Sequence, residues 1–195
     1  MKDDGSGSYQ VTLNMSQSKT KLSSIMKLKT INDHPVPSKG EILDRLDEIK
    51  AELSKTSGIT NVKTSMDFSN FICVISLDFS SVSQLNKAIH NVKVSENAKG
   101  AMLNDDFSYD AKEKVFERKN VYSLKDVYTK MSNADKEVFT AASFTGIYKF
   151  GSEVSSVSNS DAKISASKKA VMVKLNAASI LKQKKSIENK IKILH

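Results

Sequence analysis

Residues 37–59, PSKGEILDRLDEIKAELSKTSGI, contain the clearest helix pattern in the chain. Ser38 and Glu41 have the spacing of a capping box, in which each side chain accepts a hydrogen bond from the backbone N–H of the other. Gly58 suits the C-terminal stop. The apolar residues recur every three or four positions and form one stripe, which consists of Ile42, Leu46, Ile49 and Leu53. The stretch predicts an amphipathic helix that covers another layer of structure.

The residues that follow this helix alternate between apolar and polar side chains, which is the period of a half-buried strand. Two such runs, 62–68 and 71–79, are separated by Ser69-Asn70 and predict an antiparallel hairpin. A second helix is expected over 82–93, where Ser81 and Gln84 repeat the capping spacing.

The N-terminal end of the chain predicts a turn followed by a strand. Asp4-Gly5-Ser6-Gly7 favours a chain reversal, because glycine adopts the positive φ that tight turns need. Residues 9–16 then alternate as a strand does, and we expect Tyr9, Val11, Leu13 and Met15 to pair with a neighbouring strand although the lead-in is short.

The second half of the chain adds a strand pair over 107–119, a third helix that begins after Ser123, and short β-branched runs from residue 143 onward. The third helix carries Leu124, Val127, Tyr128 and Met131 and continues toward Val138-Phe139. The pattern predicts an α+β fold, mostly an antiparallel sheet covered by about three helices, with an all-β C-terminal part. We divide the chain into an α+β part, 1–142, and a lysine-rich β part, 143–195, continuous with the same domain.

The positive charge is concentrated at the C-terminal end. The formal net charge is +8, and residues 162–195 account for it with one acid, Glu188, and nine lysines: Lys163, Lys168, Lys169, Lys174, Lys182, Lys184, Lys185, Lys190 and Lys192. One interpretation of such an asymmetry is an anionic partner, whether nucleic acid, a membrane headgroup or an acidic polymer. Lysines that alternate with Ile, Val and Leu are also typical of the solvated face of antiparallel strands. Residues 151–195 contain no Arg, Tyr, Phe or Trp to read or stack on bases, so we favour the strand interpretation over a nucleic-acid surface.

Residues typical of catalysis and metal binding are scattered. His34, His90 and His195 show no metal-ligand spacing, and Cys73 is expected to be a buried, inert thiol. No phosphate loop or nucleophile elbow occurs. We therefore predict no catalytic, cofactor-binding or metal site, and no cofactor.

Two acidic stretches carry the oxygen ligands that calcium prefers. Asp3-Asp4-Gly5 and Asn104-Asp105-Asp106 both lack the spacing of a calcium loop and lie where turns are expected, so solvated turns are the preferred interpretation.

Three stretches carry a resemblance to a known family. DGSGSYQVTLNMSQ (4–17), GSEVSSVSNSDAKISASKKAVMVKL (151–175) and SIENKIKI (186–193) resemble exported lipoproteins of Bacteroidetes, whose function is uncharacterised. In that family an Asp-Gly-Ser-Gly turn joins the first two strands, and a lysine-rich hairpin follows a Val-x-Ser-Val-Ser-Asn pattern. The architecture is similar to that of mycobacterial LppM-type lipoprotein domains.

The resemblance implies a non-enzymatic domain of the cell envelope, periplasmic or surface-exposed, that binds an unidentified protein or small ligand. It also implies a membrane attachment through a lipid anchor that is absent from this sequence, so that Met1 is an added start and the strand before Asp4 has been cut away. The chain itself, with no apolar run long enough to span a bilayer, is expected to be soluble.

Two alternatives stay open. The first is a cytosolic basic protein that binds nucleic acid through the lysine-rich C-terminal region, although we consider nucleic acid the less favoured partner. The second is a hydrolase of cell-wall material that uses dispersed acids such as Asp67, Asp78 and Asp110.

Overall fold

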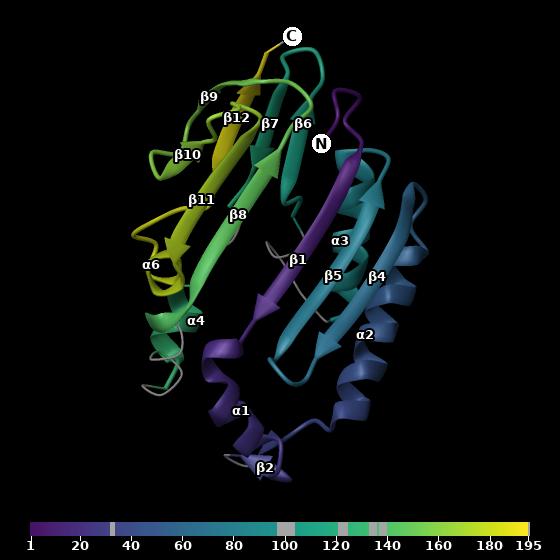
Figure 1. The fold of residues 1–195 in the computed structure, drawn as a ribbon, viewed down its shortest axis with the longest axis vertical. Helices are drawn as coiled ribbons and strands as arrows, with labels where there is room; N and C mark the ends of the chain where they lie inside the picture. The colour runs from purple at the N-terminus through teal and green to yellow at the C-terminus, as the bar shows by residue number, and fades with distance from the viewer. Residues whose placement is uncertain (32–33, 97–103, 121–124, 133–135, 137–139, 195) are drawn as a thin grey trace.

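The computed structural model describes residues 1–31, 34–96, 104–120, 125–132, 136 and 140–194 (Figure 1). In chain order its elements are β1 (Gly7–Asn14), a 3-10 turn (Ser16–Ser18), α1 (Lys19–Ile25), β2 (Thr30–Ile31), β3 (His34–Pro35), α2 (Lys39–Ser54), β4 (Ile59–Asp67), β5 (Ile72–Phe79), α3 (Val82–Ser95), β6 (Phe107–Asp110), β7 (Val115–Arg118), α4 (Lys125–Lys130), β8 (Ser143–Lys149), β9 (Val154–Val157), β10 (Ala162–Ile164), β11 (Ala170–Asn176), α6 (Ala177–Leu181) and β12 (Asn189–Ile193).

A three-stranded antiparallel sheet with the order β1-β5-β4 forms one part of the molecule, and α2 and α3 lie behind it in Figure 1. The predicted capping box of α2 is present, with Ser38 and Glu41 bonded reciprocally. Leu46 and Leu53 of the predicted stripe are buried, so this helix forms for the reasons that the sequence indicates. In α3 the Ser81 side chain accepts from the Gln84 N–H.

Two further antiparallel sheets, ordered β10-β11-β8 and β6-β7-β12-β9, pack against each other. Figure 1 shows β8 and β11 in front of β7 and β12. Phe116 of β7 meets Tyr148 of β8 with ring centroids 5.6 Å apart, and Val171 of β11 shares a buried cluster with Ile191 of β12. Each of these two sheets therefore has one face in the core and one outer face.

The main core cluster joins elements from both halves of the chain. One buried cluster unites Leu53 of α2 and Leu77 of β5 with Phe107 of β6 and Ile191 of β12. Strands from both sides of residue 142 also share a sheet, because β12 pairs with β7 and β9.

The structure confirms the α+β class, and every described strand pair is antiparallel. It differs from the expectation of one sheet under helices. The alternating runs after residue 107 bury their apolar faces against each other, because β7 and β12 supply a second apolar layer for β8 and β11.

The third predicted helix corresponds in part to α4. Ser123, Leu124, Val138 and Phe139 lie outside the described residues, as does the side chain of Val127. The α1 helix was not predicted; it buries none of its residues, so it has no apolar stripe to reveal it. No helix in the described part of the chain is long and apolar enough to cross a membrane.

The predicted N-terminal turn and strand are present. Lys2 N–H donates to the Ser6 carbonyl at 2.7 Å, Gly5 has a φ of 83°, and β1 pairs along its length with β5. Ahead of the turn, Met1 bonds to the end of β8: its amino group donates to the Lys149 carbonyl at 2.6 Å and its carbonyl accepts from Gly151 N–H at 3.1 Å.

Candidate functional site

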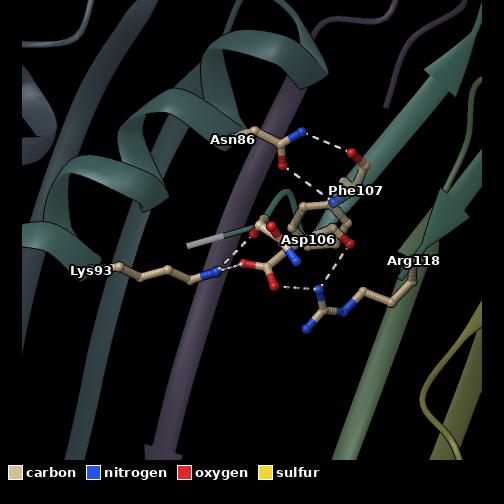
Figure 2. Close-up of polar contacts among 6 residues, drawn as sticks. Asn86, Lys93, Asp106, Phe107 and Arg118 are labelled. Atoms are coloured by element: carbon tan, nitrogen blue, oxygen red, sulfur yellow. Dashed lines mark hydrogen bonds and ion pairs between the residues drawn. The ribbon is translucent and has the colours of Figure 1, made fainter. Parts of the chain in front are cut away.

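A buried charged cluster lies where α3 meets β6 and β7 (Figure 2). Asp106, immediately before β6, is 6% exposed. Lys93 Nζ of α3 donates to its Oδ2 at 2.7 Å, and Arg118 Nη1 of β7 forms an ion pair with its Oδ1 at 3.1 Å. The same Arg118 nitrogen donates to the Asp106 carbonyl oxygen at 2.9 Å.

The neighbouring Asn86 fixes the start of β6. Its Nδ2 donates to the Phe107 carbonyl at 2.8 Å, and its Oδ1 accepts from the Phe107 N–H at 3.2 Å. The Arg118 guanidinium lies 4.8 Å from the centre of the Phe107 ring. Because each of these groups is engaged by a neighbouring element, we assign the cluster to holding α3 against β6 and β7.

The interpretation of residues 104–106 as a solvated turn is wrong for Asp106, because Lys93 and Arg118 approach it from elements distant in the sequence. For Asp3-Asp4-Gly5 a turn is confirmed: the Asp4 Oδ1 accepts from the Ser6 N–H at 2.8 Å, and the hydrogen bonds from Ser6 lower the pKa of Asp4. Among the described residues, no group of three or more His, Cys, Asp or Glu side chains is placed to hold a metal ion.

The three acids of the hydrolase alternative are not brought together. Asp67 is the strand partner of Ile72, six residues from Asp78 along β5, which separates the two acids by roughly 20 Å. Asp67 accepts from Ser69 N–H and from Asn70, whose side chain is the largest influence lowering the Asp67 pKa.

The other two acids also serve local structure. Asp78 accepts from Asn61 Nδ2 at 2.7 Å and from Ser8 Oγ, and the Asn61 bond is the main cause of its lowered pKa. Asp110 accepts from the N–H groups of Lys112 and Glu113. Each carboxylate thus supports a turn or a strand pair.

Cys73 is half-buried rather than buried, and desolvation raises the pKa of its thiol, which disfavours the reactive thiolate. His90 lies exposed on α3. His195 and the side chain of His34 lie outside the described residues.

Two open depressions occur on the described surface, with volumes of about 440 and 680 Å³. The smaller contains Glu153 and Lys168, whose charged groups lie 3.9 Å apart. The larger contains Glu117 and Lys190, 3.7 Å apart. The larger also contains Asp110 and Glu113, so most of its charged lining residues are acidic.

The nine C-terminal lysines do not form one surface. Lys163 and Lys174 lie on the outer face of the β10-β11-β8 sheet, whereas Lys190 and Lys192 lie on the outer face of the sheet packed behind it. Lys168 and Lys169 occupy the turn between β10 and β11, and Lys182, Lys184 and Lys185 follow α6. Lys185 bonds to both carboxylate oxygens of Asp161, at 2.8 and 2.9 Å.

The outer face of the β10-β11-β8 sheet gathers uncompensated charge around an apolar centre. Ile147 of β8 and Met172 of β11 are directly paired and are 58% and 37% exposed. Exposed lysines surround them: Lys163 pairs with Met172, and Lys174 and Lys149 lie two residues along the same face of β11 and β8. We name these five residues the basic sheet face.

None of the strand residues on this face is acidic; besides those five it carries Ser143, Thr145, Ala170 and Asn176. In the described part of the chain no carboxylate lies within ion-pair distance of Lys149, Lys163 or Lys174. The acid nearest along β10, Asp161, is already bonded to Lys185.

Three members of the basic sheet face, Lys149, Ile147 and Met172, were not among the sequence-predicted site residues. The alternation in SFTGIYK (143–149) places Ile147 and Lys149 on one face, which was the available indication. Their meeting with Met172 and Lys163 depends on strand register, which the sequence does not display.

No family model, no curated protein and no solved structure matches this chain.

Proposed function

We propose that this chain is a non-enzymatic binding domain of the cell envelope, attached by a lipid anchor, that engages an anionic partner through the basic sheet face. The observation that carries the proposal is the set of three exposed lysines around Ile147 and Met172 on a face without acids. A surface with exposed apolar groups inside a rim of one charge is suited to recognition.

The envelope assignment is supported by the resemblance of residues 4–17, 151–175 and 186–193 to exported lipoproteins. In this chain two of those stretches meet: the Asn189 Oδ1 accepts from the N–H groups of Ser158 and Asn159, at 3.2 and 3.1 Å, and Asn189 is completely buried. A binding role without a reaction is supported by the local structural tasks of Asp67, Asp78 and Asp110.

Metabolic labelling of the product of the intact gene with a fatty acid, followed by cell fractionation, tests this proposal. We expect label in a protein recovered with the envelope. The matched control is the 195-residue chain started at Met1, which should remain unlabelled because the proposed anchor precedes it. An unlabelled, cytosolic product of the intact gene would overturn the proposal.

A further inference from the structure

We propose that the basic sheet face docks on an anionic lipid bilayer and so sets the orientation of the anchored domain. This inference rests on the proposed envelope function and names the partner of the same face. It follows from three features of the described residues: uncompensated charge, an exposed apolar centre and the position of Met1.

The charge of the face is complementary to anionic headgroups. Lys149, Lys163 and Lys174 project from three adjacent strands, with no acidic residue between them. A lysine near an anionic membrane surface contributes about 1 kcal/mol to binding. Three of them produce only weak binding in solution, but a lipid anchor supplies a high effective concentration, so a weak contact is sufficient to orient the domain.

The apolar centre favours a bilayer over a nucleic acid. Ile147 and Met172 lie exposed among the lysines, where the acyl boundary of a membrane can accept them. A phosphate backbone has no such region, and the face presents no arginine or aromatic residue among its exposed positions.

The place of Met1 is consistent with this geometry. Met1 is bonded to Lys149 and Gly151, at the end of β8. Residue 1 therefore lies beside one of the three strands of the basic sheet face.

Co-sedimentation of the 195-residue chain with a large excess of phosphatidylcholine vesicles, with and without phosphatidylglycerol, tests the inference at low salt, because excess lipid populates even a weak contact. We expect binding only to the anionic vesicles, and weakening as salt is added. The double variant Lys163→Gln/Lys174→Gln should bind about thirtyfold more weakly, which corresponds to the loss of two lysines.

Lys190→Gln/Lys192→Gln is the matched control, because it removes the same charge from the outer face of the opposite sheet. It should reduce binding less than about threefold. Ile147→Ser/Met172→Ser should also weaken binding, and this loss should persist at high salt, since it removes apolar contact. Thermal unfolding of each variant is the control that checks whether it is folded.

Equal weakening by the two lysine pairs would overturn the inference, because binding would then follow net charge rather than a face. Absence of binding to anionic vesicles would also overturn it. If a DNA duplex is bound instead, and Lys163→Gln/Lys174→Gln weakens that complex, the face is a nucleic-acid surface. Envelope labelling of the gene product with no vesicle binding would refute this inference alone, whereas an unlabelled cytosolic product would refute the proposed function.

Discussion

The two outer faces of the paired sheets both carry lysines, but in opposite electrostatic settings. On the β10-β11-β8 sheet, Lys149, Lys163 and Lys174 have no acid among their cross-strand neighbours. On the β6-β7-β12-β9 sheet, Lys190 lies opposite Glu117, and Lys192 shares its face with Asp110 through Val115.

This difference shows that strand register, rather than the number of lysines, decides where a binding surface can form. The lysine-rich C-terminal segment contributes lysines to both outer faces. On one of them β7 places Glu117 beside Lys190 and so compensates the charge of that lysine. The β8 strand does the reverse, since it adds Lys149 and the exposed Ile147 to the other face.

The largest expected loss of stability comes from removing a side chain that packs between the two sheets. Ile191 is completely buried between the sheets, so Ile191→Ala should lower the free energy of unfolding by about 3 kcal/mol. Its neighbour Lys192 is exposed, and Lys192→Ala should change the stability by less than about 0.5 kcal/mol. Urea unfolding of both variants measures the contrast; similar losses would mean that Ile191 is not a core residue.

A second large effect is expected where charges are compensated inside the protein. Asp106→Asn should destabilise the fold by about 3 kcal/mol, because it removes the acid from between Lys93 and Arg118. Asp105→Asn, at an exposed neighbouring position, is the control and should be nearly neutral. Equal, small effects in chemical denaturation would refute the structural assignment of the cluster.

The balanced face can be made to resemble the basic one. Glu117→Gln removes the acid beside Lys190 and should raise the affinity for phosphatidylglycerol vesicles by about fivefold at low salt. In this background Lys190→Gln/Lys192→Gln should become as damaging as a substitution on the basic sheet face. Unchanged vesicle binding would show that charge compensation by Glu117 is not the reason why this face does not bind anionic vesicles.

The smallest effect is expected at a lysine whose backbone has a positive φ. Lys168 has a φ of 56° in the turn between β10 and β11, a conformation that favours glycine. Lys168→Gly should stabilise the protein by about 0.5 kcal/mol in thermal unfolding, with vesicle binding altered by less than about twofold. A strong loss of vesicle binding would instead place Lys168 in the membrane contact.

The helices and strands that are stabilised by contacts between residues close in the sequence could be predicted. The capping box and apolar stripe predicted α2, and the alternation around Ser69-Asn70 predicted the β4–β5 hairpin, because each depends on contacts a few residues apart. The same reasoning placed Lys174, Lys190 and Lys192 on exposed strand faces, which the structure confirms.

What could not be predicted depends on pairing between distant segments. The division of the strands into separate sheets follows from β12 pairing with both β7 and β9. The burial of Asp106 depends on Lys93 and Arg118, which arrive from α3 and β7. The basic sheet face likewise requires the register that sets Ile147 against Met172, and a shift by one residue would turn these side chains into the core.

The proposed contact between the basic sheet face and an anionic bilayer is tested most directly with an environment-sensitive fluorophore placed at one position on each outer face. In a Cys73→Ser background, Met172→Cys places the label on the basic sheet face and Lys192→Cys places it on the opposite face. On addition of phosphatidylglycerol vesicles we predict a blue shift at position 172 and none at position 192. Equal shifts at both positions, or a shift at position 192 alone, would show that the basic sheet face is not the surface that contacts the bilayer.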